Sequence, residues 1–183
     1  MVDLKPTLIM VVGVPGSGKT TLASALTKKI VNSAVISKDL IQTEFATDER
    51  LGQVYSKIAR PTFNLLVSFA KTLLAHEKVP IIDAPFSLNA WRNNALSNWV
   101  KPFKEITRNT RLAIIRCLPK DEGHLKKRLL ERGHKRDKWK LDNWGEFLKR
   151  EPIHFPIDHD DVLEIVTDKP VEEIADRVVG YLQ

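Results

Sequence analysis

Residues 13–20 read Gly13-Val14-Pro15-Gly16-Ser17-Gly18-Lys19-Thr20 and decide how the chain is expected to fold. They match the pattern G-x-x-x-x-G-K-[ST] at every fixed position. The context also agrees, because the apolar run Thr7–Val12 comes before and a helical pattern starts at about Lys19. The glycines let backbone N–H groups point at phosphate oxygens, and the helix N-terminus adds its positive end. The sequence therefore predicts a phosphate-binding loop between a buried strand and a helix.

Two side chains of this loop have expected tasks. Lys19 is expected to reach the β- and γ-phosphates of a nucleotide, and the Thr20 hydroxyl is expected to bind Mg²⁺. The residues expected to contact the nucleotide are Gly13, Val14, Pro15, Gly16, Ser17, Gly18, Lys19, Thr20 and Thr21. The alternative is a glycine-rich turn without a ligand, and the complete motif between strand and helix argues against it.

Five short apolar runs alternate with helical patterns along the chain. The strand candidates are Thr7–Val12, Ala34–Ile36, Val79–Ile82, Leu112–Cys117 and Val162–Val166. Such runs are typical of strands covered on both faces, and their alternation with helices favours a mostly parallel sheet. Ligands bind such sheets beyond the carboxyl ends of the strands. We predict an α/β fold of three layers, in one domain over residues 1–183.

The longest helical pattern places Leu65, Phe69 and Leu73 on one apolar stripe. Pro61 interrupts this pattern, and a proline inside a helix must kink it or separate two helices. The segment 48–78 that contains the pattern is expected to help shape a pocket for a second ligand.

An acid follows the second strand candidate. Asp39 comes directly after Ser37 and Lys38, about twenty residues beyond the loop, and there it faces the same crevice. It is expected to take the proton of an acceptor hydroxyl, as the base of a kinase does. The alternative is an N-cap role for Asp39 at the start of the next helix, and the residues alone leave both open.

A second acid, Asp83, ends the third strand candidate. An acid at this place beside a phosphate-binding loop is a typical partner of Mg²⁺, and capping of the following turn is the alternative. Many ATP hydrolases carry a glutamate directly after this aspartate, whereas this chain has Ala84. The chain also lacks an N-K-x-D run for guanine. Both absences favour ATP and transfer to a bound acceptor over hydrolysis and over GTP.

The net charge of +6 is concentrated in residues 126–140, and the rest of the chain is neutral. A field concentrated in one place attracts a phosphate-bearing ligand there, and a solvated basic helix face is the alternative. We predict a mobile basic lid over about residues 126–144. The side chains expected to neutralise the transferred phosphoryl group are Arg128, Arg132 and Arg136.

The apolar residues around this lid also carry expectations. Leu125, Leu129 and Leu130 are expected to face the core, and Gly133 to end their helix. The tryptophans nearby, Trp139 and Trp144, are expected to anchor the lid to its own domain more than to stack on a base.

Composition excludes several classes of protein. The 183 residues are 43% hydrophobic and can fill a core, which argues against disorder. A single cysteine, Cys117, excludes an intrachain disulfide and a zinc site built from several cysteines. The five histidines show no metal-ligand spacing, and no run is long enough for a signal peptide or a membrane span. A soluble cytoplasmic protein is therefore expected.

Together these residues make the chain resemble the small P-loop kinases that group polynucleotide 5′-kinase, zeta toxin, chloramphenicol phosphotransferase and gluconate kinase. The resemblance rests on the loop and on the runs 36–39, 81–86, 128–132 and 136–141. It implies the strand order 2-3-1-4-5, a general base at Asp39, and lid arginines that contact ATP phosphates. The chain departs from several relatives that act on nucleic acids, because Gln42 stands where they carry an arginine.

The expected function is ATP- and Mg²⁺-dependent transfer of the γ-phosphoryl group to a hydroxyl of a small-molecule acceptor, with Thr20 and Asp83 at the metal. The alternatives are a polynucleotide 5′-hydroxyl kinase, an ATP-binding regulatory protein and a zeta-toxin-like kinase. A nucleic acid partner is possible but less favoured than a small molecule, and no membrane partner is expected. The residues after Asp83, such as Phe86, Trp91 and Arg92, are expected near the acceptor. The identity of that acceptor and the oligomeric state stay open.

Overall fold

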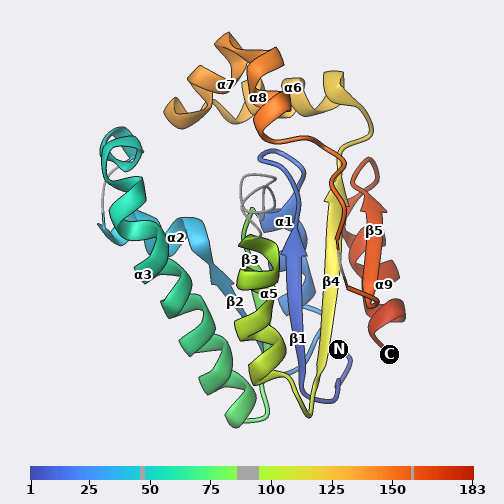
Figure 1. Cartoon of the computed structure of the whole chain (residues 1–183). Coiled ribbons are helices and arrows are strands. Elements are labelled where there is room, and N and C mark those ends of the chain that lie inside the picture. The colour runs from blue at the N-terminus through green and yellow to red at the C-terminus, as the bar shows by residue number, and fades with distance from the viewer. Residues whose placement is uncertain (46–47, 86–94, 158) are drawn as a thin grey trace.

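The computed structural model describes residues 1–45, 48–85, 95–157 and 159–183. Five strands form one parallel sheet in the order β2-β3-β1-β4-β5 (Figure 1). Their bounds are β1 Thr7–Val12, β2 Ser33–Ser37, β3 Val79–Asp83, β4 Arg111–Leu118 and β5 Val162–Val166. Each predicted strand lies within one residue of these bounds. The strand order implied by the resemblance is confirmed.

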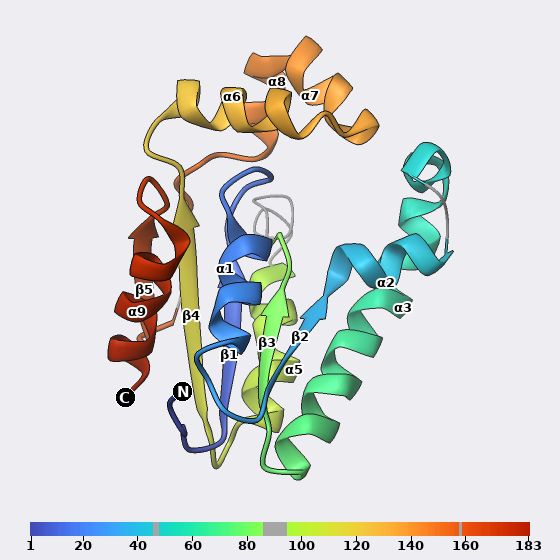
Figure 2. The same cartoon turned by 180° about the vertical axis from the view of Figure 1, so that it is seen from behind.

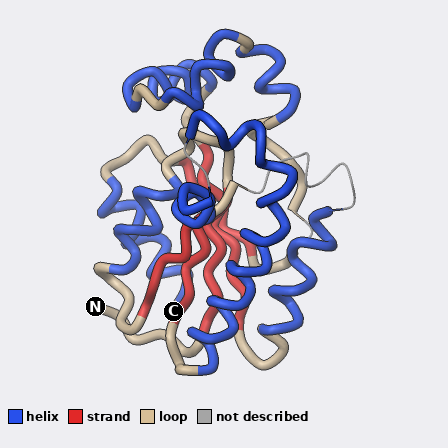
Figure 3. The backbone as a smooth tube through the Cα atoms, turned by 90° about the vertical axis from the view of Figure 1, so that its left-hand side faces the viewer, coloured by secondary structure: helices blue, strands red, loops and turns tan. Residues whose placement is uncertain are grey.

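Helices cover both faces of the sheet, which gives the predicted three layers (Figures 1 to 3). On one face lie α1 (Lys19–Thr27) and α9 (Val171–Leu182), and on the other lie α3 (Asp48–Ala75) and α5 (Ala95–Ile106). The short helix α2 (Lys38–Phe45) follows β2 and contacts α3. No helix in the described part of the chain is long and apolar enough to cross a membrane.

The central strand β1 fills both layers of the core. Its residues alternate in direction, so Ile9 and Val11 pack under α1 and α9, whereas Leu8, Met10 and Val12 pack under α3 and α5. All six residues of β1 are buried. This rigid apolar strand leads directly into the loop that starts at Gly13, so the loop is fixed to the most buried part of the fold.

Helix α3 continues through Pro61, so the proline does not separate two helices. The Thr62 hydroxyl donates to the Ile58 carbonyl at 2.8 Å, so this carbonyl in the turn before Pro61 has a hydrogen-bond donor. The predicted apolar stripe is partly wrong: Leu66 and Ala70 are fully buried, whereas Phe69 is 48% exposed. Apolar residues occupy two neighbouring faces of this helix, and periodicity alone does not tell which face packs.

Four helical segments lie beyond the carboxyl ends of the strands (Figure 1), and we call them the lid helices. They are α6 (Glu122–Arg132), the 3₁₀ helix η1 (Lys135–Asp137), α7 (Lys138–Asp142) and α8 (Trp144–Arg150). They extend past the expected lid segment 126–144 at both ends, and residues 134–139 are helical for the most part.

The lid helices have a small core of their own, which contains Val14 of the loop, Leu125, Leu129 and Phe147. Trp144 packs against this core and contacts the Phe147 ring, as predicted. Leu130 was expected to face a core but is 59% exposed. Leu125 and Leu129 stand four residues apart and share one face of α6, from which the next residue turns away.

Candidate active site

The loop between β1 and α1 depends on glycine at two positions. Gly13 has φ +143°, and a Cβ atom there would lie 2.4 Å from the carbonyl oxygen of Cys117. Gly18 has φ +90° and precedes the first residue of α1 in the left-handed conformation. Side chains are strongly disfavoured in both places. The glycines of the motif therefore allow the backbone to pass close to β4 and turn directly into the helix.

Lys19 is held inside the curve of this loop. The residue is only 8% exposed, and its Nζ donates to the Val14 carbonyl at 2.9 Å. Burial lowers the pKa of Lys19, and the negative charges of Asp83 and Asp39 oppose this. An ammonium group that has lost most of its water interacts strongly with an anion brought into the loop.

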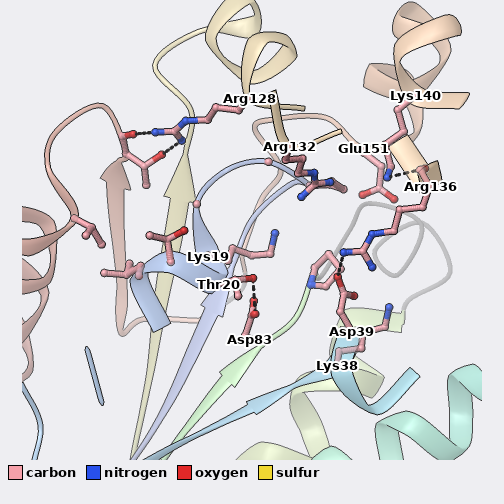
Figure 4. A pocket seen from close by; sticks show the side chains of 18 of the residues that line it. Lys19, Thr20, Lys38, Asp39, Asp83, Arg128, Arg132, Arg136, Lys140 and Glu151 are labelled. Atoms are coloured by element: carbon pink, nitrogen blue, oxygen red, sulfur yellow. Dashed lines mark hydrogen bonds and ion pairs between the residues drawn. The ribbon is translucent and has the colours of Figure 1, made fainter. Parts of the chain in front are cut away.

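The next residue, Thr20, connects the loop to β3. Its hydroxyl donates to Oδ2 of Asp83 at 2.7 Å, across 63 residues of sequence (Figure 4). Burial raises the pKa of Asp83, and the hydrogen bond from Thr20 and the charge of Lys19 oppose this. Because the Thr20 proton points at the carboxylate, the oxygen lone pairs of Thr20 stay available. A hydroxyl and a carboxylate are hard oxygen ligands, so this pair fits a magnesium ion.

Asp39 lies in the first turn of α2, and the hydrogen bond that caps this turn comes from another side chain. The Leu40 N–H bonds instead to the Ser37 hydroxyl at 3.5 Å. The Asp39 carboxylate reaches across to the lid helices and pairs with Nη2 of Arg136 at 2.9 Å (Figure 4). The N-cap alternative for Asp39 is therefore disfavoured, and its carboxylate faces the space between sheet and lid.

The first lid arginine, Arg128, ties the lid helices to two other loops. Its Nη1 donates to the Thr167 hydroxyl at 2.7 Å, and its Nη2 bonds to the Thr167 carbonyl. The Thr167 hydroxyl also lies 2.9 Å from the Ser17 carbonyl and 3.1 Å from the Leu118 carbonyl. The side chain of Thr167 thus joins the lid, the phosphate-binding loop and the end of β4.

A buried acid, Asp137, binds two further cations of the lid helices. Asp137 is fully buried and accepts hydrogen bonds from Nε of Arg132 and, at 2.5 Å, from Nζ of Lys140. Burial by itself would raise the pKa of Asp137, but the bonds from Arg132 and Lys140 outweigh it and hold the pKa below its ordinary value. Asp137 is therefore a charged carboxylate that fixes two cations at the cavity wall.

One cavity of about 950 Å³ lies between the carboxyl ends of the strands and the lid helices, and the site residues described above line it, with Asp137 behind its wall as the partner of Arg132 and Lys140. This volume lies at the upper end of the range for small-molecule sites. Figure 4 shows two parts of it. Lys19, Thr20 and Asp83 lie below Arg132 in one part, which we call the loop side. The other part, which we call the α2 side, is lined by Lys38, Asp39, Gln42, Arg136, Lys140 and Glu151.

Residues 8–150 match the AAA_33 family, which is described as an AAA domain. This match covers well over half of the chain. The chain belongs to this family of P-loop kinases. The resemblance drawn from the sequence is therefore confirmed.

Solved structures of similar fold include kinases of small molecules and a Pnkp1/Rnl/Hen1 complex (TM-score 0.55, 19% identity, 92% of this chain and 48% of that one). They include a sugar kinase from Janibacter sp. HTCC2649 (TM-score 0.66, 15% identity, 97% of this chain and 94% of that one). A gluconokinase from Sinorhizobium meliloti 1021 has TM-score 0.63 and 14% identity over 99% and 93%. An APS kinase from Mycobacterium tuberculosis, in complex with AMPPNP and APS, has TM-score 0.61 and 13% identity over 98% of both chains. At these identities the likeness establishes the P-loop kinase fold. No curated protein matches the chain.

The sequence of this AAA_33 member did not reveal the whole α2 side. In the sequence, Gln42 was noticeable only as a departure from relatives that act on nucleic acids. Asp137 and Lys140 were only two of the charged residues in the segment 126–140. The spacing of Asp137 and Lys140, three residues apart at the start of a helix, is the signal that could have found this pair. Phe86, Trp91 and Arg92 lie outside the described residues. Among the described residues, no side chain of α3 lines the cavity, although η1 contacts this helix.

Proposed function

We propose that this chain is an ATP- and Mg²⁺-dependent phosphotransferase that moves the γ-phosphoryl group to a hydroxyl of a small molecule. One observation carries the proposal. The Thr20–Asp83 pair and the buried Lys19 line the same cavity as the Asp39 carboxylate, which faces them from α2. A phosphate site and a base on opposite sides of one cavity are what transfer between two bound substrates requires.

On the loop side, the chain's own groups hold the nucleotide. Free backbone N–H groups of the loop, such as those of Gly16, Gly18, Lys19 and Thr20 at the start of α1, receive the phosphates. Lys19 exchanges the Val14 carbonyl for a phosphate oxygen between the β- and γ-positions. Thr20 and Asp83 would hold Mg²⁺, and a bound ion would supply positive charge that offsets the charge of the phosphates. The bond from Thr20 to Asp83 keeps both oxygens in place before the ion arrives.

In the transfer step, Asp39 accepts the proton of the acceptor hydroxyl as the acceptor oxygen attacks the γ-phosphorus. The bond between that phosphorus and the oxygen bridging to the β-phosphate breaks, and its electrons leave with ADP. The products are a phosphate monoester, ADP and one proton. Arg132 and Arg136 neutralise charge on the phosphoryl group in transit. Before transfer, Arg136 must leave Asp39, its partner at 2.9 Å. Substrate binding therefore frees the Asp39 carboxylate to act as the base, and at the same time gives Arg136 a phosphate group as its new partner.

A second candidate, a polynucleotide 5′-hydroxyl kinase, is favoured by one observation. Four lysines of the lid helices are exposed on the outer surface: Lys126, Lys127, Lys135 and Lys138. Against it, Lys38 is buried at the cavity wall and so does not extend a basic track along the surface. Arg132 and Lys140 are also held by Asp137. A small acceptor is therefore the better fit.

The test is an acceptor screen. ADP release from ATP and Mg²⁺ is measured with sugars, nucleosides, antibiotics and 5′-hydroxyl oligonucleotides, and products are identified by mass spectrometry. We expect at least one small molecule to stimulate ADP release and to gain one phosphoryl group. Stimulation by oligonucleotides alone favours the second candidate. An ATP-dependent change in partner binding without transfer to any acceptor would indicate a regulatory protein.

A further inference from the structure

Helix α2 carries a buried carboxamide one turn after Asp39. Gln42 is only 4% exposed and lines the same cavity as Asp39. Its Nε2 atom is shielded from solvent and has no hydrogen-bond partner among the residues that the structure describes. A buried polar atom in this state destabilises the empty protein.

The position of Gln42 relates this unpaired amide to the second substrate. Residues three apart on a helix lie on the same face, so the side chains of Asp39 and Gln42 are neighbours on the cavity side of α2. The cations nearby already have partners in the protein. Arg136 pairs with Asp39, and Lys140 pairs with Asp137. Among the described residues of this wall, the Nε2 atom of Gln42 is a buried donor that has given up water without gaining a partner.

We propose that Gln42 recognises the acceptor by hydrogen-bonding an oxygen next to the hydroxyl that Asp39 orients. This inference rests on the proposed function and names the substrate class. The unpaired Nε2 atom donates, and a second hydroxyl of the acceptor can receive that bond. Because the cations nearby already have partners in the protein, a neutral hydroxyl fits this place better than a carboxylate or a phosphate ester. The acceptor is therefore a polyhydroxylated small molecule, such as a sugar or the sugar of a nucleoside. Two of its neighbouring hydroxyls span Asp39 and Gln42.

A purely structural glutamine makes the opposite prediction. A structural amide would be bonded to the protein, and its removal would cost stability. An amide kept for a ligand costs stability while the site is empty, and its removal costs recognition of the acceptor. The two explanations are therefore separated by the sign of the stability change in the ligand-free protein.

The first measurement uses Gln42→Met, which keeps the length of the side chain but removes its polar atoms. We expect the thermal midpoint of the ligand-free variant to rise by about 2–4 °C. The control is Glu44→Met, which places a methionine on the exposed side of the same helix and additionally removes one surface charge. A fall in the midpoint of Gln42→Met, with the control unchanged, would show that the amide has a structural role and would overturn the inference.

The second measurement follows transfer of label from γ-labelled ATP to D-ribose, D-gluconate, thymidine and a protein-free metabolite extract below 1 kDa. We expect the wild type to label a polyhydroxylated compound and Gln42→Met to lower kcat/KM for it about tenfold. The control should keep the wild-type value, and the Kd of AMPPNP should stay within twofold in both variants. Equal transfer by Gln42→Met, or loss of AMPPNP binding, would overturn the inference and leave the proposed function intact. If the wild type labels nothing, the proposed function fails and the inference fails with it.

Discussion

The two sides of the cavity are built by different forces. On the loop side, glycine geometry and the apolar core under β1 hold Lys19, Thr20 and Asp83 in place, and the side chains of Lys19 and Asp83 are largely shielded from water. On the α2 side, the pair of Asp39 and Arg136 joins two half-exposed side chains, 42% and 27% exposed, from elements 97 residues apart. Ion pairs of this kind contribute little to stability. The loop side is therefore set before substrates arrive, whereas the α2 side is free to rearrange around them.

This contrast has a functional reason. A phosphate site that is already formed loses no energy to reorganisation during the reaction. An acceptor site must admit its substrate and then close over it to exclude water, which favours contacts that exchange easily. The bond between Asp39 and Arg136 is such a contact, because both partners gain a substitute when substrates bind.

The largest effect is expected from Asp39→Asn, which changes only the α2 side. An amide does not accept the proton, so we expect transfer to fall about 10²–10⁴-fold. ATP affinity should be nearly unchanged, because the nucleotide occupies the loop side. Turnover is compared with calorimetric nucleotide binding, and Glu44→Gln on the exposed side of α2 is the control. If turnover is unchanged while the protein loses about 1 kcal/mol of stability, Asp39 is a helix cap after all.

Lys19→Ala changes only the loop side and should affect both transfer and nucleotide affinity. The ammonium of Lys19 meets phosphate charge in the ground state and in the transition state, so we expect transfer to fall about 10²–10³-fold, with weaker ATP binding. Lys28→Ala, an exposed lysine directly after α1, is the control for lost charge. Circular dichroism should show an intact fold. Wild-type turnover in Lys19→Ala would mean that the loop is only a turn.

The same contrast explains what could be predicted from the sequence. The loop side was readable because the motif, its strand and the acid Asp83 are local patterns with strict geometric needs. The α2 side was readable only as an acid at residue 39 and an excess of basic charge. That Asp137 is the buried partner of Arg132 and Lys140 depends on how the lid helices pack against one another. That the Nε2 atom of Gln42 has no partner among the described residues depends on the wall of the finished cavity, which no local pattern describes. The buried face of α3 was missed for a related reason, since Phe69 and Leu66 are equally apolar.

Asp137→Asn tests whether one buried acid organises the α2 side. The variant loses the charge that holds Arg132 and Lys140, so we expect the free energy of unfolding to fall by about 1–3 kcal/mol near pH 7. The pKa of Asp137 is lower in the folded protein than its ordinary value of 3.8. Its contribution is therefore fully present above about pH 4 and is lost as the pH falls through the folded pKa. Unfolding of wild type and variant should thus converge in acid.

The measurement for this variant is urea unfolding from pH 7 down to pH 2.5, with Asp142→Asn on the exposed end of α7 as the control. A stability difference that stays constant over this range would show that the charge of Asp137 does not hold the two cations.

A smaller and local effect is expected in hydrogen exchange. Backbone amides of residues 132–144 should exchange faster without nucleotide and become protected with AMPPNP, because phosphates replace the exposed ion pair as the partner of the lid cations. Amides of β1 should be equally protected in both states, since the apolar core holds them. Equal protection of residues 132–144 in both states would mean that the lid helices form a fixed basic surface.

The smallest effect is expected in the salt dependence of oligonucleotide binding, and it decides between the two candidate acceptors. Each phosphate neutralised on a single strand adds about 0.7 to the slope of log K against log salt. The cations that line the cavity are held by protein groups, since Arg128 bonds to Thr167 and Arg136 pairs with Asp39. Among the exposed lysines of the lid helices, Lys127 has its charge partly balanced, because its Nζ atom lies 3.7 Å from Oε1 of Glu131. We therefore expect weak binding of 5′-hydroxyl oligonucleotides, with a slope worth no more than about one or two phosphates.

The quadruple variant that replaces Lys126, Lys127, Lys135 and Lys138 by glutamine should remove this slope without changing transfer to a small acceptor. Tight binding with a slope worth about four phosphates, together with labelled 5′ ends, would establish that the lid surface tracks a nucleic acid backbone.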